Sequence, residues 1–129
     1  MEKQVINPWQ WQQQRSYVQA VEVQHVMGTL YCAGQAAVDA QGNSSTADME
    51  TQLRQAQQNV EQVIRTAGYE CQNIVRLTLY TTSSAELFAC FGVFQEWVAR
   101  HGIQTAATLL EVKGLFETLK VELEATVVK

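Results

Sequence analysis

The sequence predicts an α+β fold in which one sheet carries two helices on a single face. Two stretches repeat apolar residues at the helical period and end at a glycine, while the other apolar segments are short and alternating, as strands are. Their order is β-β-α-β-α-β-β, and two helices are too few to cover both faces of a sheet of about five strands. With 129 residues, 47% of them hydrophobic, residues 1–129 are expected to form one domain with one core.

The N-terminal part is predicted to hold an arm and a hairpin. Residues 1–15 are rich in glutamine but contain two tryptophans, so we expect this arm to lie against the body of the domain. Ser16–Gln24 alternates, and Thr29–Gln35 follows it; the two are expected to pair as a hairpin with Gly28 in the turn. Gly34 interrupts the second strand, which indicates a bulge or a close approach of the backbone.

The first helix is predicted over Asp48–Ala67, where a stripe of apolar residues repeats at 3.6 spacing. Thr46 or Asp48 can cap its start, and Gly68 ends it. The opposite face is expected to be solvated and consists of Gln52, Gln55, Gln58, Glu61 and Gln62.

The second helix is predicted to begin at Ser83, which can form a capping box with Glu86. Gly102 stops it, and His101 just before that point is expected to act as a cation at the helix end. The buried stripe of this helix consists of Leu87, Phe91, Phe94 and Val98.

Three further strands are predicted over Asn73–Thr82, Thr105–Val112 and Leu119–Val128. The last one alternates strictly and is apolar enough to lie inside a sheet, so Glu122, Glu124 or both are expected to point into an enclosed space. Glu124 is also expected to pair with a lysine of the same strand or with a neighbouring subunit. The sheet face without helices is expected to be apolar, which predicts a homo-oligomer, most simply a cyclic one.

Composition excludes several classes of function. The net charge of −4 provides no basic field for nucleic acid or anionic lipid, and no apolar run approaches the length of a membrane span. The three cysteines show no CxxC spacing and the start of the chain does not resemble an export signal, so reduced thiols in the cytoplasm are expected. No metal site is expected, because neither His25 nor His101 sits at ligand spacing. No glycine-rich nucleotide motif is present, and no cofactor is expected.

The chain resembles the RidA family, also called the YjgF or reactive-intermediate-deaminase family. The resemblance runs over nearly all of residues 16–128, and it is the order and spacing of the pieces that identify the family. It implies a chorismate-mutase-like fold and a homotrimer with the sheets as an inner barrel and the helices outside. It also implies a small-molecule ligand in clefts between the subunits. The pieces are SYVQAV, AGQ followed by VD, QLRQAQQNVEQVIRTAG, IVRLTLYTT, LLEV and VELEATVV.

The best-known activity of the family is the hydrolysis of small imines and enamines that pyridoxal-phosphate enzymes form from serine or threonine. By resemblance, Glu122 is the acid that positions water, and Tyr17 lines the pocket. The arginine that grips the substrate carboxylate does not carry over, because Ala107 stands in its place. Arg15, two residues before Tyr17, is the candidate for supplying the missing charge.

Three other pocket positions also depart from the family pattern. Ala33 replaces a serine, Leu109 replaces a cysteine, and Gly92 replaces an asparagine on the second helix. Losing a bidentate contact between an arginine and a carboxylate costs roughly 2–5 kcal/mol of binding. The resemblance therefore predicts a divergent imine or enamine hydrolase that is a poor deaminase of 2-iminopropionate and 2-iminobutyrate. The alternatives are a non-catalytic binding module and a translation-inhibitor or chaperone-like protein on the same fold.

Overall fold

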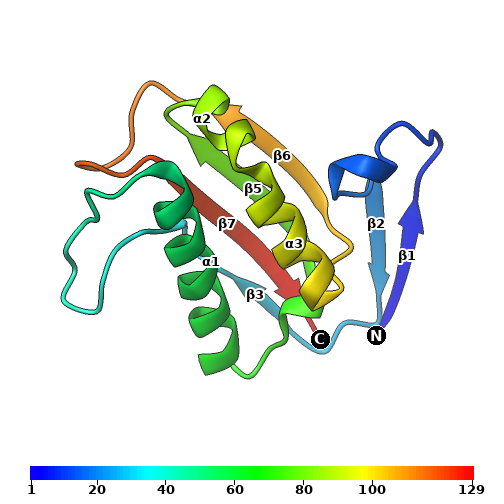
Figure 1. Cartoon of the computed structure of the whole chain (residues 1–129). Coiled ribbons are helices and arrows are strands. Elements are labelled where there is room, and N and C mark those ends of the chain that lie inside the picture. The colour runs from blue at the N-terminus through cyan, green and yellow to red at the C-terminus, as the bar shows by residue number, and fades with distance from the viewer.

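A five-stranded sheet carries all three α-helices on one of its faces (Figure 1). The computed structural model describes all 129 residues. The strands are β3 (Thr29–Tyr31), β4 (Gln35–Ala36), β5 (Ile74–Thr81), β6 (Ala106–Glu111) and β7 (Val121–Val128). Their order is β3-β7-β5-β6, with β4 also paired to β7, and only the β5–β6 pair is parallel. The α+β class that the sequence predicts is confirmed.

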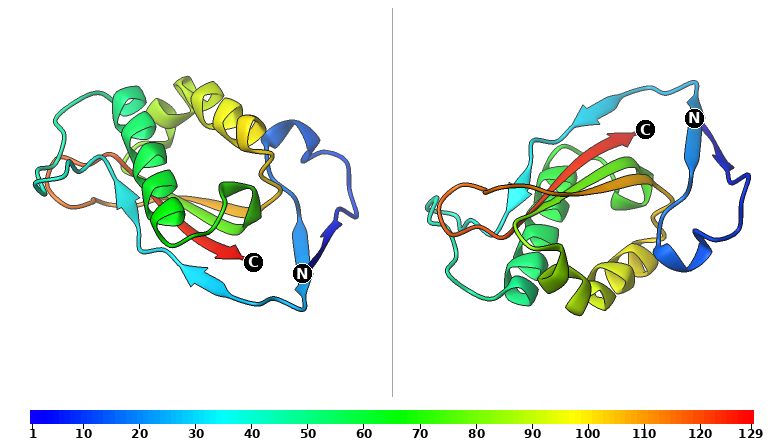
Figure 2. Two further views of the ribbon diagram at one scale, coloured as in Figure 1. Left: turned by 90° about the horizontal axis from the view of Figure 1, so that it is seen from below. Right: turned by 90° about the horizontal axis from the view of Figure 1, so that it is seen from above.

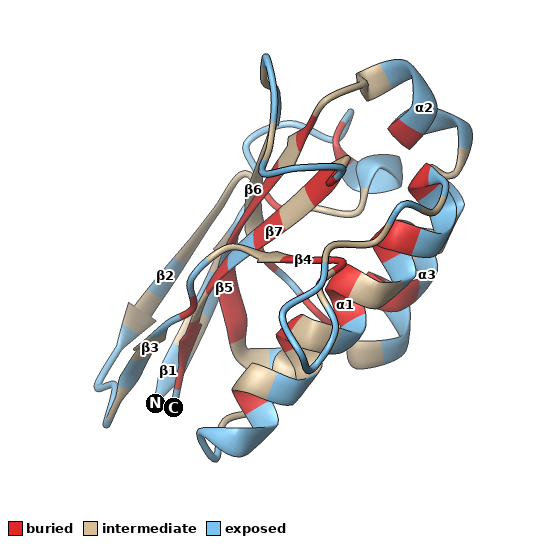
Figure 3. Ribbon diagram, turned by 90° about the vertical axis from the view of Figure 1, so that its left-hand side faces the viewer, coloured by how far each residue is buried: buried red, intermediate tan, exposed pale blue.

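The core lies between the sheet and the helices, where the buried residues gather (Figure 3). The predicted alternation of β7 is confirmed, since its odd-numbered residues from Val121 to Val127 are at most 2% exposed. They pack with the buried stripe of the helices in one cluster of 18 buried residues. None of the helices is long and apolar enough to cross a membrane.

Helix α1 (Met49–Thr66) matches its predicted span and is capped by Asp48, whose side chain accepts a hydrogen bond from the Thr51 backbone N–H at 2.9 Å. The prediction of a fully solvated polar face was wrong at Glu61, which is partly buried and accepts a hydrogen bond from the Trp97 indole at 2.7 Å, and most clearly wrong at Gln52. This side chain is fully buried; its amide donates to backbone carbonyls, including that of Thr118, and its oxygen accepts from the Lys120 N–H at 2.9 Å. Gln52 thereby ties the start of α1 to the chain just before β7.

The second predicted helix is divided into α2 (Ser84–Ala89) and α3 (Phe91–His101). Ser83 caps α2 by accepting from the Glu86 N–H, and Gly102 ends α3 in the left-handed region, both as predicted. The break falls at Cys90, whose backbone leaves the helical region at φ −122° and ψ 21°. Gly92 follows directly, and glycine has a low helix propensity, so continuation through this point is weakly favoured.

The predicted hairpin between the second and third strands is wrong. Strand β2 (Ala20–Gln24) pairs instead with β1 (Glu2–Ile6), which belongs to the glutamine-rich arm, and β3 pairs with β7. The β1–β2 ribbon stands apart from the main sheet (Figure 2). Sequence patterns indicate which residues are extended but not which strand they pair with, and the short polar β1 resembles a loop.

The arm contacts the body of the domain at defined points, as expected. The Val18 N–H donates to the Thr105 carbonyl at 2.9 Å, which bridges the chain before β2 to the start of β6. Lys3 of β1 donates to the Asn73 side chain at 3.0 Å. The arm is therefore folded, with β1 in its first part and a 3₁₀ turn over Gln13–Arg15 in its last part.

The sheet face without helices is polar, which corrects the prediction of an apolar face. It presents alternate residues of β5, β6 and β7: Arg76, Thr78, Tyr80, Ala106, Thr108, Leu110, Glu122, Glu124 and Thr126. Two hydrogen bonds cross it, from Arg76 to the Thr108 hydroxyl at 2.7 Å and from the Tyr80 hydroxyl to Glu124 at 3.2 Å. Glu124 thus has a partner other than the expected Lys120, which pairs with Glu86 at 3.2 Å.

Candidate functional site

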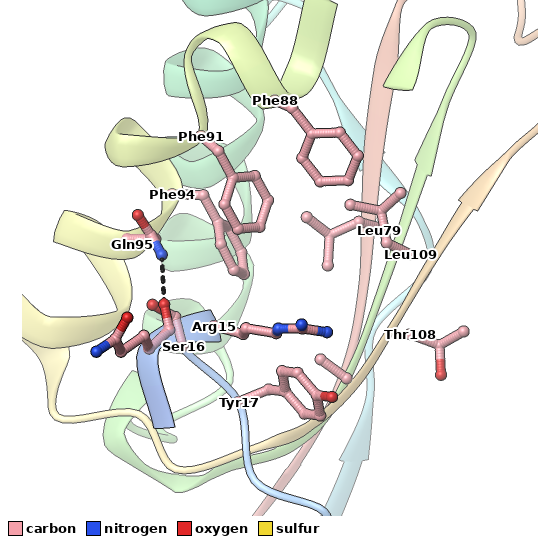
Figure 4. Close-up of a pocket in the computed structure, with 12 residues that line it drawn as sticks. Arg15, Ser16, Tyr17, Leu79, Phe88, Phe91, Phe94, Gln95, Thr108 and Leu109 are labelled. Atoms are coloured by element: carbon pink, nitrogen blue, oxygen red, sulfur yellow. Dashed lines mark hydrogen bonds between the residues drawn. The ribbon is translucent and has the colours of Figure 1, made fainter. Parts of the chain in front are cut away.

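A cavity of about 490 Å³ lies between helices α2 and α3, strand β6 and the end of the N-terminal arm (Figure 4). We call it the Arg15 cavity. Its three walls come from parts of the chain that are far apart in sequence. Each wall follows from a local pattern, and together they surround a space that is mostly apolar with one cationic side chain.

The first wall is an aromatic ladder formed by Phe88, Phe91 and Phe94. The ring centroids of Phe88 and Phe91 are 5.6 Å apart, and those of Phe91 and Phe94 are 5.2 Å apart. Residues three apart share a helix face, which keeps the ladder on one side despite the break at Cys90. Phe94 is buried in the core at 1% exposure, whereas Phe88 is 59% exposed at the mouth. The ladder therefore leads from solvent down to the core.

The second wall comes from the sheet. Ala107 and Leu109 of β6 lie opposite Leu77 and Leu79 of β5 in the parallel register, so all four face the helices. Of these four, Ala107, Leu109 and Leu79 line the cavity. The methyl group of Ala107 leaves space beside the arm, in the position where the family resemblance places an arginine.

The third wall is the arm, where Arg15 and Tyr17 line the cavity. Ser16 between them adopts a left-handed backbone with φ 62°, which turns the chain at the cavity. Gln95 of α3 donates to the Gln14 carbonyl at 3.1 Å and holds the turn in place. In Figure 4 the Arg15 side chain extends into the cavity above the Tyr17 ring.

Arg15 is also oriented from outside the cavity by the two tryptophans of the arm. Its guanidinium carbon is 5.0 Å from the ring centroid of Trp11, within the range of a cation–π contact. Trp11 stacks in turn on Trp9, with ring centroids 6.1 Å apart. Because this contact restricts a flexible side chain, less conformational entropy is lost when the guanidinium binds an anion.

Glu122 lies in a different place, on the sheet face opposite the Arg15 cavity. It pairs with Tyr80 of β5 and with Ala36 of β4 and borders a separate hollow of about 660 Å³ that also includes Phe116. We call it the Glu122 hollow. The predicted close approach at Gly34 is confirmed: a Cβ atom there would be 2.6 Å from the Glu122 carboxyl carbon. Glycine at position 34 thus makes room for this carboxylate.

The structure therefore divides the residues that the sequence singles out. Arg15, Tyr17, Ala107 and Leu109 meet in the Arg15 cavity, while Glu122 borders the Glu122 hollow. Ala33 is exposed between β3 and β4, next to Gly34. Gly92 is exposed on α3 and lines neither space, with open space around the position of a Cβ atom.

Sequence reasoning missed the aromatic ladder. It assigned Phe91 and Phe94 to the buried stripe of one continuous helix and left Phe88 unassigned. The signal was a phenylalanine at every third position, which is a denser aromatic row than a core stripe needs. Packing alone determines that this row faces a cavity.

The thiols offer no nucleophile to either space. Burial raises the pKa of Cys32, and it raises the pKa of Cys71 to about 11 and that of Cys90 above its usual value. All three are free cysteines. Nowhere in the chain do three or more His, Cys, Asp or Glu side chains converge as they do around a metal ion.

Comparison with known proteins decides the family. The sequence profile described as Endoribonuclease L-PSP matches residues 10–129. The chain belongs to this family, which includes the RidA (YjgF) proteins. A 2-iminobutanoate/2-iminopropanoate deaminase of Salmonella typhimurium is 26% identical over 114 residues, covering 88% of this chain and 87% of that protein. A RutC family protein of Aquifex aeolicus is 27% identical over 113 residues, covering 88% of both chains.

Solved structures support the same family. The Rid-family protein YyfB of Yersinia pestis, described as of unknown function, has a TM-score of 0.87 at 30% identity and covers 100% of both chains. The YjgF gene product of Escherichia coli has a TM-score of 0.72 at 27% identity and covers 88% of this chain and 87% of its own. The structural match to YyfB thus extends over the whole chain, including the N-terminal arm.

Proposed function

We propose that this RidA-family protein hydrolyses a small imine or enamine at a cleft between subunits, with its specificity altered by the loss of the family arginine. The observation that carries the proposal is the position of Arg15. Its guanidinium lies in the same cavity as Ala107, where the family resemblance expects a carboxylate-binding arginine. The cation is thus supplied by the arm instead of strand β6.

Arg15 suits this role because a guanidinium can bind a carboxylate through two parallel hydrogen bonds, and such pairs are strong in an apolar surrounding. Tyr17, directly beneath it in the same cavity, offers a hydroxyl to the substrate. A cation on the arm approaches from a different direction than one on β6. The arrangement therefore favours a substrate of different shape from 2-iminopropionate.

The proposed cleft needs two chains. Within one chain, Arg15 and Glu122 lie on opposite sides of the sheet, so they cannot act on one small molecule. A head-to-tail interface places the patch of one subunit against a different patch of the next and closes into a ring such as a trimer. The exposed aromatic side chain of Phe116, which lines the Glu122 hollow, is available to such an interface.

In the proposed reaction, Arg15 of one subunit holds the substrate carboxylate and Glu122 of the next accepts a proton from water. The water oxygen bonds to the imine carbon while the imine nitrogen gains a proton, which gives a carbinolamine. The carbon–nitrogen bond then breaks, and ammonia leaves a keto acid behind. Water and imine are the only reactants, so the balance needs no oxidant, reductant or cofactor. Glu122 acts as the general base of the first step.

The test is an assay that forms imines in place with an amino-acid oxidase and follows the release of ammonia. Arg15→Gln is expected to weaken apparent substrate binding by roughly 2–5 kcal/mol, because the cation is lost from the cavity. Arg54→Gln is the matched control, since Arg54 is exposed on α1 and pairs only with Glu50. Equal kinetics in the two variants would show that Arg15 does not hold the substrate.

A binding module without turnover is the second candidate. The observation in its favour is the apolar character of the cavity, where Ala107 and Leu109 stand in place of an arginine and a cysteine. A binding module has no need of a carboxylate that orients water. Ligand binding that is retained in Glu122→Gln, together with no turnover by the native protein on any imine tested, would favour this candidate.

A further inference from the structure

We infer that the ligand of the Arg15 cavity is a monocarboxylate with an aromatic side chain, such as the imino or keto acid of an aromatic amino acid. The inference deepens the proposed function, since it concerns the same cavity. It rests on the walls of the cavity and on the placement of its single cation, so it holds for a binding module as well as for an enzyme.

The aromatic ladder is the first reason. Phe88, Phe91 and Phe94 stand in a row with ring centroids 5.6 and 5.2 Å apart, in edge and tilted orientations. Aromatic rings prefer such offset or edge contacts with one another. A ligand ring placed against Phe91 extends the same row. Phe88 is 59% exposed at the mouth, so a bound ring covers apolar surface that is otherwise in water.

The size of the cavity is the second reason. Its volume of about 490 Å³ lies in the range of pockets for ligands larger than a three-carbon acid, roughly 300–1,000 Å³. Leu79 and Leu109 continue the apolar lining opposite the ladder (Figure 4). A methyl or ethyl side chain leaves most of this lining in contact with water, whereas a phenyl or indole ring covers more of it.

The charge of the cavity is the third reason. Arg15 is the only ionised group among the lining residues, which include no carboxylate. One guanidinium balances the single charge of a carboxylate through two parallel hydrogen bonds, whereas a phosphate with two charges needs further cationic groups that this lining does not contain. The cation and the ladder are in different walls, so the ligand carries its charge and its ring at separate ends.

The test measures binding, with phenylpyruvate, pyruvate and phenylacetamide as probes in titration calorimetry on the native protein. Phenylpyruvate is expected to bind at least about tenfold more tightly than pyruvate, because each added apolar group in a hydrophobic pocket contributes roughly 10–200-fold. Phenylacetamide, which has the ring but no charge, is expected to bind more weakly than phenylpyruvate. Pyruvate binding as tightly as phenylpyruvate would overturn the inference.

The variant Phe88→Ala tests whether the ring of the bound ligand lies against the aromatic ladder. It removes an exposed side chain with little cost in folding, and it is expected to weaken phenylpyruvate binding several-fold while pyruvate binding stays constant. Met27→Ala is the control, since Met27 is 91% exposed and lines neither space. Equal weakening for both probes, or none for phenylpyruvate, would contradict the placement of the ring. Selective binding without any imine hydrolysis would refute the proposed function and leave this inference intact.

Discussion

The Arg15 cavity lies beside β6, under α2 and α3, whereas the Glu122 hollow lies beside β4 and α1 toward the other edge of the sheet, and the two are built in different ways. The Arg15 cavity is walled by large side chains that continue into the core, such as Phe94 and Leu79. The Glu122 hollow depends on an absent side chain at Gly34 and lies beside the short strand β4. One chain thus offers a place to bind a ligand and a separate place for a carboxylate. The proposed chemistry needs both, which makes it a property of the assembly.

Because the two regions are built differently, mutations in one are expected to affect folding stability and mutations in the other are expected to affect the reaction. Changes in the wall of the Arg15 cavity affect the core, because its deepest residues belong to the main buried cluster. Changes in the Glu122 hollow affect a half-buried carboxylate and a glycine near the edge of the sheet. The following experiments test whether the two regions respond as differently as their construction indicates.

Glu122→Gln is expected to have the largest effect, a fall in kcat of about 10²–10⁴-fold, because a glutamine cannot accept the proton from water. The melting temperature and ligand binding to the Arg15 cavity are expected to stay close to those of the native protein. Glu124→Gln, two residues along the same face, is the control and is expected to keep its activity. A variant of Glu122 with unchanged kcat would remove this carboxylate from the mechanism.

Phe94→Ala tests whether the wall of the Arg15 cavity contributes to folding stability. Phe94 is 1% exposed and forms the floor of the ladder, so its truncation is expected to lower the free energy of unfolding by about 3–5 kcal/mol. Urea denaturation followed by tryptophan fluorescence measures this. Phe88→Ala, at the exposed end of the same row, is expected to change the free energy of unfolding by far less. Equal losses in the free energy of unfolding would mean that the exposed and the buried end of the ladder contribute equally to stability, contrary to this account.

Gly34→Ala tests how the Glu122 carboxylate is placed. The added Cβ atom would lie 2.6 Å from the Glu122 carboxyl carbon, so this flexible side chain must move. A displacement of about 1 Å at a reacting group costs about 100-fold in rate, so kcat is expected to fall by about that factor while the protein stays folded. Activity at the native level would show that the position of the carboxylate is not critical. Gly114→Ala, where a Cβ atom meets nothing within 4 Å, serves as the control.

The smallest expected effect concerns Glu61, which joins α1 to α3, the helix that carries most of the ladder. Burial raises its pKa, but hydrogen bonds from His101 at 2.9 Å and Trp97 at 2.7 Å outweigh this, and the pKa lies below its ordinary value. A lowered pKa in the folded state gives stability that is complete above the unfolded pKa of about 4.3 and is lost as the pH falls through the folded pKa. Glu61→Gln is expected to unfold about 1 kcal/mol more easily at pH 7, the difference between a charged and a neutral acceptor.

The pH dependence provides the check on this last prediction. Urea denaturation at a series of pH values is expected to show the difference between the native protein and Glu61→Gln shrinking below about pH 4, as the carboxylate is protonated. A constant difference across this range would mean that the hydrogen bonds do not depend on the charge.

Much of the fold could be predicted because hydrophobic periodicity and helix-capping residues are local features of the sequence. The strict alternation of β7, the cap at Asp48 and the stop at Gly102 all follow from nearby residues, and each agrees with the structure. The partner of β2 could not be predicted, since pairing depends on distant segments and the polar Glu2–Ile6 does not resemble a strand that competes for it. Gln52 was misplaced for the same reason, because its four partners lie outside its helix.

The site was predictable only in part. Resemblance to the family selected Tyr17, Ala107 and Leu109, and Arg15 was chosen as the nearby cation that could replace the missing arginine; the structure brings these four together. The side of the sheet on which each residue falls depends on register, and this separates Glu122 from them. The aromatic ladder was not predicted as part of a cavity, because buried and cavity-lining phenylalanines give the same helical pattern.

In the proposed mechanism, one cleft combines Arg15 of one chain with Glu122 of its neighbour. The most direct test mixes Arg15→Gln and Glu122→Gln chains by co-expressing them in equal amounts, and measures activity at substrate concentrations well below the native KM, where each pure variant is expected to be nearly inactive. Each required side chain is then intact in half of the chains, so about a quarter of the clefts carry both, and about a quarter of native activity is expected. If activity in the mixed oligomers stays at the level of the pure variants, the two residues do not meet across an interface and the account is contradicted.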